Sequence, residues 1–148
     1  MESYDNFLEG CLFFNVNALS RTLLKLAEKE FKTLKLSPAH ASLLLLVYDT
    51  PGISPKQLSQ LLNLTPSTIT RFVDSLEKKK ILSREAQGKS SHISPSRKGL
   101  EMKEAVALAY KHLILKYTDI LGAQAAHQLS FSILTANKKI SALADQNE

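Results

Sequence analysis

Apolar positions recur at helical spacing over most of the chain. From residue 7 to residue 34 they recur every three or four positions, which predicts one long helix. Its apolar stripe is wide and suits packing on more than one side. A second helix is expected from Ala39 to Asp49, after the start signal Ser37-Pro38. Because the stretch LLLLVY leaves this helix almost no polar side, it should lie at the centre of the core.

Two further start signals, each a hydroxyl residue followed by proline, begin at Ser54 and Thr65, eleven positions apart (65 − 54). Gln57 completes a capping box with Ser54. A leucine-rich pattern follows each signal, so we expect two short helices joined by a tight turn at Asn63-Leu64. The inner face of the first of these helices should hold Leu58, Leu61 and Leu62.

The second of these short helices separates into two sides at 100° per residue. Its apolar side holds Ile69, Phe72, Val73 and Leu76. Its polar side holds Ser67, Arg71, Asp74, Ser75 and Lys78, with Thr68 and Thr70 on the flanks. Reading the DNA major groove requires such a helix, bearing hydroxyls and an arginine and braced by a partner helix. We therefore interpret Ser67, Thr68, Thr70 and Arg71 as candidate DNA-facing residues, and Thr65 as a cap.

The pattern changes after Ile81-Leu82. Residues 83–86 and 91–94 have strand character and flank a glycine turn at 87–90, which predicts a β-hairpin. A hairpin directly after such a helix is the wing of a winged helix. Ile53 is expected to form a strand of one or two residues.

The remainder of the chain is again helical. One helix should start at Ser94 or Ser96 and run to about Leu121, where Gly122 breaks it. A last helix is expected from about Ala123 to Ala144. Its inward positions should be Ala126, Leu129, Ile133, Leu134, Ile140 and Leu143.

These elements predict a fold that is mainly α with a small β-hairpin wing. Residues 1–35 form an N-terminal dimerisation helix, residues 36–96 a winged helix-turn-helix DNA-binding domain, and residues 97–148 the C-terminal dimerisation helices. The flanking helices carry more apolar surface than one small domain can cover. We therefore expect a homodimer with twofold symmetry.

Charge is concentrated where the two short helices lie. The chain carries a net charge of +5. Residues 51–99 hold nine Lys and Arg against three Asp and Glu, and the remaining residues hold ten against eleven. A phosphate-bearing partner, double-stranded DNA, fits this asymmetry, and a merely solvated basic face is the alternative. The candidate phosphate contacts are Lys56, Lys78, Lys79, Arg84, Lys89 and Ser90.

Other classes of protein are disfavoured. A single cysteine, Cys11, excludes an internal disulfide and a multi-cysteine metal site. The histidines show no paired metal spacing, and no nucleophile–base constellation or glycine-rich phosphate loop is present, so we expect no enzyme, cofactor or metal. The acidic start is unlike a signal peptide. The longest apolar run, Leu43 to Tyr48, falls far short of the roughly 20 residues that span a bilayer. We expect a cytoplasmic protein without membrane contact.

The chain resembles the MarR family of bacterial transcription regulators. The resemblance rests on LSPAHASLLLLVYDTPGISPKQLSQLLNLTPSTITRFVDSLEKKKIL and on the later SPSRKG. In that family, threonine-arginine and leucine-glutamate-lysine elements lie on the recognition helix, here Thr70-Arg71 and Leu76-Glu77-Lys78. Two positions depart from the family pattern. Lys80 stands where many relatives have glycine, and Gln87-Gly88-Lys89 stands in a shorter wing in place of an Asp-x-Arg element.

The resemblance implies a homodimeric repressor on a pseudo-palindromic operator, with half-sites about 10 bp apart. It also implies a small ligand, often an anionic aromatic, that weakens DNA binding. Candidate effector-binding residues are Phe14, His40 and Tyr48.

Two other functions remain open. One is a redox-sensing regulator switched through Cys11, for which a buried structural cysteine is the alternative interpretation. The other is a winged-helix module for protein interaction that does not read DNA.

Overall fold

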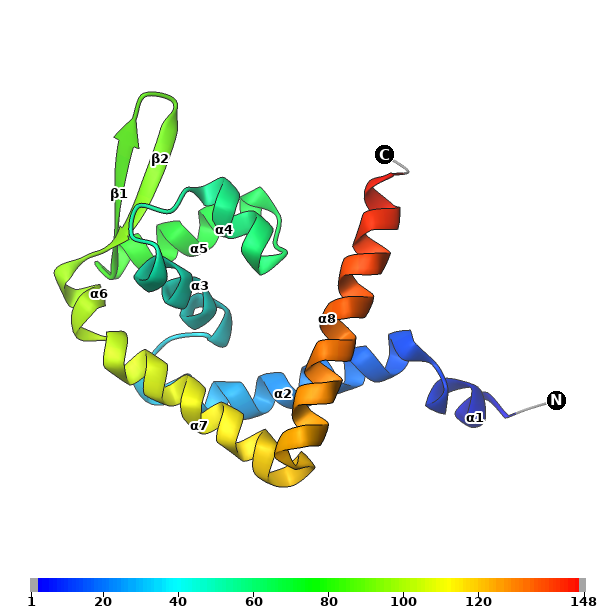
Figure 1. Cartoon of the computed structure of the whole chain (residues 1–148). Coiled ribbons are helices and arrows are strands. Elements are labelled where there is room, and N and C mark those ends of the chain that lie inside the picture. The colour runs from blue at the N-terminus through cyan, green and yellow to red at the C-terminus, as the bar shows by residue number, and fades with distance from the viewer. Residues whose placement is uncertain (1–2, 147–148) are drawn as a thin grey trace. The chain divides into compact units, whose positions relative to one another are not determined.

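The computed structural model describes residues 3–146, which form two compact units, one ending at Tyr110 and one beginning at Lys111 (Figure 1). The first unit contains α1 (Tyr4–Glu9), α2 (Leu12–Phe31), the 3-10 turn η1 (Lys32–Leu34), α3 (Pro38–Asp49), α4 (Pro55–Leu62), α5 (Pro66–Lys78), β1 (Leu82–Gln87), β2 (Ser90–Pro95), α6 (Arg97–Glu101) and the start of α7 (Lys103–Leu121). The second contains the rest of α7 and α8 (Ala123–Asp145). The predicted fold class, mainly α with a small hairpin wing, is confirmed. The boundaries 1–35, 36–96 and 97–148 stay a prediction.

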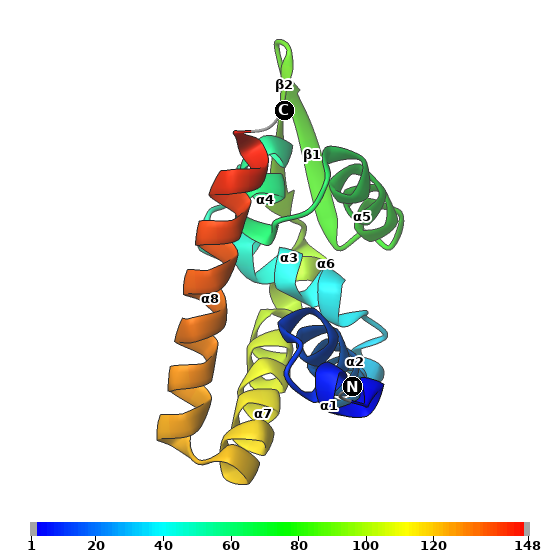
Figure 2. The same cartoon turned by 90° about the vertical axis from the view of Figure 1, so that its right-hand side faces the viewer.

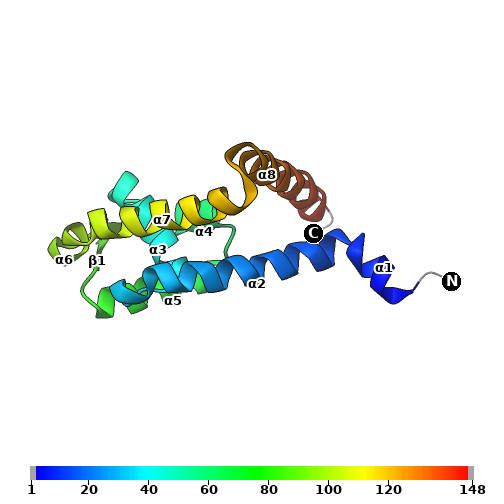
Figure 3. The same cartoon turned by 90° about the horizontal axis from the view of Figure 1, so that it is seen from below.

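The long first helix was predicted wrongly as one element. It divides at Gly10 into α1 and α2, which meet at a bend (Figure 3). Glycine disfavours a helix interior by about 1 kcal/mol. The side-chain amide of Asn15 donates to the Glu9 carbonyl at 2.8 Å and so satisfies one of the carbonyls that the break leaves without a helical partner. The last predicted turn is η1, which ends at Lys35 in the left-handed region with φ 54°.

The helix-turn-helix starts as predicted. The Ser54 hydroxyl accepts from the Gln57 amide and the Gln57 side chain accepts from the Ser54 amide, which completes the capping box. Thr65 caps α5 by accepting from the Thr68 amide at 3.3 Å. Asn63 makes the turn between the helices in the left-handed conformation, φ 53°, which asparagine tolerates.

One leucine of α4 does not face the core. Leu58 is fully buried and Leu62 half-buried, but the Leu61 side chain is 60% exposed. Leu61 lies 100° around α4 from Leu62. The surface that covers Leu58 and Leu62 therefore does not reach Leu61. The prediction that all three leucines face inward is therefore wrong for Leu61.

The core of the first unit is built around α3, as its apolar sequence predicted. Leu43, Leu44 and Val47 of this helix are fully buried, and α3 packs against α2, α4 and β2. Ile69 and Leu76 of α5 are also fully buried. These side chains fix how α5 is rotated about its own axis.

The hairpin is slightly longer than predicted. It is antiparallel in the register Leu82↔Pro95 to Gln87↔Ser90. Gly88 has φ 62° and Lys89 does not have positive φ, which is the pattern of a type II′ turn. Ile53 forms the expected short strand as a bridge to Ile93. The hairpin base is therefore tied to the segment that precedes α4.

Ser96, rather than Ser94, starts the next helix, and this helix is interrupted at Met102 between α6 and α7. Its start packs tightly on the hairpin base, because a Cβ on Gly99 would lie 2.1 Å from the carbonyl oxygen of Ile81. The Tyr48 hydroxyl donates to the Gly99 carbonyl at 2.7 Å. Contacts from α3 and from Ile81 thus converge on Gly99.

The apolar stripe of α8 is not inward in the single chain. Leu129 is 41% exposed and Ile140 59% exposed, and no residue of α8 is buried. The second unit contains only α8 and the last turns of α7. These two helical segments are too small to cover the apolar side chains that each of them carries. Within one chain the inward placement is therefore wrong for the five predicted leucines and isoleucines, which are all exposed, whereas Ala126 is half-buried.

Gly99→Ala is expected to destabilise the protein by about 1–3 kcal/mol, because a backbone carbonyl must move to admit the methyl group. Gly10→Ala is the matched control, since Gly10 has φ −88° and its Cβ would meet its nearest neighbour at 3.8 Å. Denaturant unfolding monitored by circular dichroism measures both. Equal loss of stability in the two variants would contradict the steric role of Gly99.

Candidate nucleic-acid interface

The polar side of α5 faces solvent because its other side is buried. Pro66 at the first helical position and the Thr65 cap fix where the helix begins. The side chains of Ser67, Thr70, Arg71 and Lys78 are exposed, and those of Thr68, Asp74 and Ser75 are half-buried. The outward face predicted from the helical period is therefore present as a continuous polar surface.

The hydroxyl groups on this face are partly engaged near the helix start. Thr65 Oγ1 lies 2.9 Å from Thr68 Oγ1 and 3.2 Å from Ser67 Oγ. Thr70 Oγ1 donates to the Pro66 carbonyl at 3.0 Å. Each hydroxyl has a donor and two acceptor sites, so each keeps capacity for a ligand.

Arg71 is an available charged group at the middle of this face. Its side chain is exposed and forms no hydrogen bond or ion pair with any residue in the range 3–146. A guanidinium offers a planar fork of donors that matches guanine O6 and N7, or a phosphate. Arg71 therefore has the chemistry and the exposure that base reading needs.

Arg84, which the sequence analysis gave as a candidate phosphate contact, forms an ion pair within the protein. Its guanidinium pairs with the Asp74 carboxylate, Nη2 to Oδ1 at 2.5 Å, and so connects β1 to α5. The two side chains are 31% and 49% exposed. The pair offsets the charge of Arg84 and holds the wing strand against the helix. A phosphate contact by Arg84 stays a prediction.

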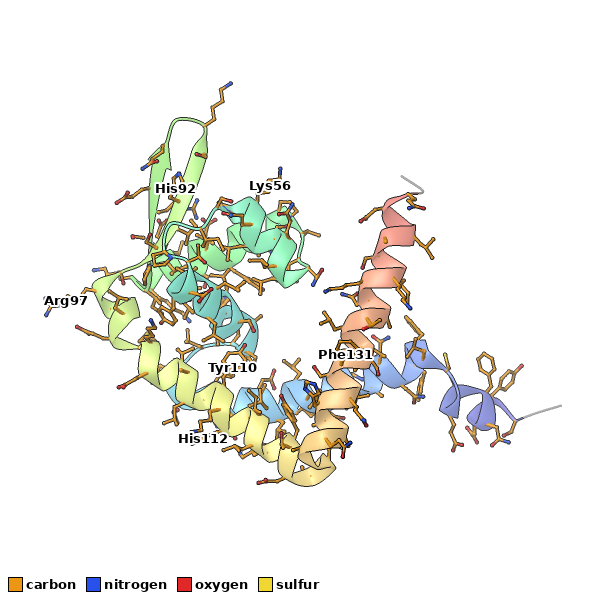
Figure 4. The ribbon with its side chains drawn as sticks, in the orientation of Figure 1. Lys56, His92, Arg97, Tyr110, His112 and Phe131 are labelled. Atoms are coloured by element: carbon orange, nitrogen blue, oxygen red, sulfur yellow. The ribbon has the colours of Figure 1, made fainter. Side chains whose placement is uncertain are left out.

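The remaining candidates on α4 and the wing are exposed. Lys56 lies on the first turn of α4 (Figure 4). Lys89 occupies the hairpin turn, and the Ser90 hydroxyl donates to the Gln87 carbonyl at 3.0 Å. The hairpin is paired as far as Gln87 and Ser90, so Gly88 and Lys89 alone form its tip.

The end of α5 forms a Schellman motif. The Ile81 amide donates to the Leu76 carbonyl at 2.9 Å and the Lys80 amide to the Glu77 carbonyl at 2.8 Å. Lys80 has φ 61°, so the position where many relatives are expected to have glycine is left-handed in this chain. A non-glycine residue costs roughly 1 kcal/mol in this conformation.

The structure adds two lysines that the sequence did not mark. Lys79 Nζ donates to the Lys35 carbonyl at 3.2 Å, and Lys98 Nζ donates to the Lys79 carbonyl at 3.0 Å. Lys35 and Lys98 lie 44 and 19 positions from Lys79. Only the tertiary fold brings them beside the end of α5, and no motif in the sequence indicated it.

The effector candidates do not form one cluster. Tyr48 is 7% exposed, its hydroxyl is bonded to Gly99, and burial raises its pKa. The His40 ring lies edge-on to Phe72 with centroids 4.7 Å apart. Phe14 is 41% exposed and lies 17 residues, about 25 Å, along α2 from the buried Phe31. An effector role for these three residues stays a prediction.

Cys11 is half-buried rather than fully buried, and it precedes α2 as its N-cap residue without a side-chain capping bond. Among residues 3–146, no group of three or more His, Cys, Asp or Glu side chains is placed to hold a metal ion. None of the helices in the same range is long and apolar enough to cross a membrane.

These elements define a winged helix-turn-helix, and comparison with known proteins agrees. Residues 36–91 match the model of the MarR family, which confirms the resemblance found from the motifs. The comparison with curated proteins found no match.

Solved structures share the fold over most of the chain. CouR from Rhodococcus jostii RHA1, bound to p-coumaroyl-CoA, is 17% identical with a TM-score of 0.77, covering 87% of this chain and 93% of its own. CouR on a 23-mer DNA duplex is 20% identical with a TM-score of 0.78, covering 93% and 99%. The S. aureus MepR–DNA complex is 14% identical with a TM-score of 0.78, covering 88% and 98%. At these identities the similarity shows a shared fold.

Acidification is expected to destabilise the protein partly through His40. Burial, and secondarily the charge of Lys79, lower the pKa of His40 below its usual 6.5. The unfolded chain therefore binds this proton first, so stability present above pH 6.5 is lost as the pH falls from 6.5 toward the folded-state pKa. His40→Gln should lose less stability between pH 7.5 and pH 5.5 than wild type in urea unfolding. The exposed His127→Gln variant should follow wild type, and identical pH dependence in all three proteins would contradict the role of His40.

Proposed function

We propose that this protein is a transcription regulator that binds double-stranded DNA through α5 and the hairpin wing. The observation that carries the proposal is the exposed polar face of α5, with Arg71 at its middle, fixed by a buried opposite face. The MarR family match and the two DNA-bound neighbours of the same fold support it.

In this proposal α5 enters the major groove. Arg71 contacts guanine O6 and N7 or clamps a phosphate, and Ser67, Thr68 and Thr70 complete the reading face. The phosphate contacts are Lys56, Lys78, Lys79, Arg84, Lys89 and Ser90. Phosphate contacts position the protein, whereas the contacts of α5 with base edges specify the sequence.

A homodimer completes the site. The exposed apolar side chains of α2 and α8 are surfaces that a second copy covers, and twofold pairing is the commonest closure. Two copies of α5 then meet half-sites about 10 bp apart on a pseudo-palindromic operator.

The regulatory mode that we propose is repression relieved by a small ligand, with an anionic aromatic as the expected class. A neighbour of the same fold bound to p-coumaroyl-CoA supports a ligand response. Phe14, His40 and Tyr48 are the candidate contacts. No catalytic role is proposed, and a cytoplasmic location remains a prediction.

Two alternatives give different outcomes. A redox regulator would lose DNA binding after peroxide treatment in wild type but not in Cys11→Ser. A protein-interaction module would enrich no DNA fragment. Selection of bound fragments from genomic DNA, followed by footprinting, tests the main proposal, which requires one palindromic site protected by a dimer.

Arg71→Ala is expected to weaken binding to the selected operator by about 1–3 kcal/mol and to relax the preference at the contacted base pair. The exposed Arg21→Ala on α2 removes the same charge away from α5 and should bind nearly as wild type. Fluorescence anisotropy titration measures both. An unchanged affinity in Arg71→Ala would remove this residue from the site.

A further inference from the structure

Four lysines from three separate segments meet beside the C-terminal end of α5. Lys79 and Lys80 directly follow the last residue of α5, Lys35 lies between η1 and α3, and Lys98 lies on α6. The bonds from Lys79 to the Lys35 carbonyl and from Lys98 to the Lys79 carbonyl connect the three segments. All four residues are exposed. We call them the lysine patch.

Two members of the patch adopt a conformation that lysine disfavours. Lys35 and Lys80 are left-handed, with φ 54° and φ 61°. The remaining left-handed residue other than glycine between positions 3 and 146 is Asn63, a residue type that adopts this conformation readily. Glycine would be more stable at both lysine positions. Strain of this kind is often stored where a side chain has a function.

No carboxylate of a described residue is recorded in an ion pair with a lysine of the patch. The pairs Arg84–Asp74 and Arg97–Glu101 include none of these four residues. Lys79 and Lys98 each give one N–H group to a main-chain carbonyl and keep two. The ammonium groups of Lys79 and Lys98 are therefore held by the backbone around them, and they remain open to a ligand rich in acceptor oxygens.

The helix α5 is longer than a DNA major groove is wide. Its 13 residues span about 20 Å, whereas the major groove is about 12 Å wide. When the half that carries Ser67 and Arg71 contacts base edges, the C-terminal end reaches the sugar-phosphate backbone. Figure 2 shows the corner between α2 and α3 on the same side of the first unit as α5.

We propose that the lysine patch binds the phosphate backbone of the DNA beside the groove that α5 reads. This inference rests on the proposed function and adds Lys35, Lys80 and Lys98 to the contacts. A lysine ammonium is a point charge that suits phosphate without reading sequence. The patch thus supplies affinity and leaves specificity to Arg71.

The test uses Lys35→Gly and Lys80→Gly, alone and combined, on the selected operator and on unrelated duplex DNA. Each variant should melt roughly 2–4 °C higher than wild type, because the strain is relieved. Each should nevertheless bind both DNAs about 3–10-fold more weakly at 0.1 M salt, with the slope of log K against log salt reduced by about 0.9 per lysine. Lys80→Arg keeps the charge and should bind as wild type.

Asn63→Gly is the matched control, because it relaxes a left-handed residue outside the patch and should leave the salt slope unchanged. The proposal is overturned if both lysine variants bind as wild type while Arg71→Ala binds weakly, a result that leaves the proposed function intact. Loss of affinity for the operator alone, with unrelated DNA unaffected, also overturns it. Absence of DNA binding by wild type would overturn the proposed function together with the patch.

Discussion

Burial of one side of α5 is the constraint on which the rest of the first unit depends. Ile69, Val73 and Leu76 are at most 2% exposed, and burying a side chain of this size contributes about 1.5–3 kcal/mol. Turning the helix to expose these residues would lose most of that free energy. The rotation of α5 is therefore fixed, and with it the exposure of Ser67, Thr70 and Arg71. The core thus selects which side chains are offered to a partner.

Contacts at the end of α5 fix the position of the wing relative to this helix. The Schellman motif at Lys80 turns the chain directly into β1, and Ser96 Oγ donates to the Lys80 carbonyl at 2.5 Å from the start of α6. Gly99 lets α6 lie against Ile81 with no side chain between them. The Arg84–Asp74 pair adds a direct link between hairpin and helix. The helix α5, the hairpin wing and α6 are therefore held in fixed positions relative to one another. A binding site built from several of these elements requires such fixed positions.

Much of the fold could be predicted because its signals are local. A hydroxyl cap followed by proline acts within one helical turn, so Ser37, Ser54 and Thr65 marked helix starts that the structure reproduces. The period of 3.6 residues separated the faces of α5 for the same reason. The prediction from local signals failed for the burial of Leu61 and for the length of the first helix. Leu61 has the spacing of a core residue but no surface to cover it, and Gly10 ended a helix that the apolar pattern alone would have continued.

The sequence by itself determined the starts of α3, α4 and α5, the position of the hairpin and the polar face of α5. These features depend on interactions between residues close in the chain. Tertiary structure alone decided that Arg84 pairs with Asp74, that Tyr48 holds Gly99, and that Lys35 and Lys98 lie beside Lys79. The residues of these interactions lie 10 to 51 positions apart. Charge and hydroxyl content can be counted along a chain, but which groups face each other depends on how the helices pack.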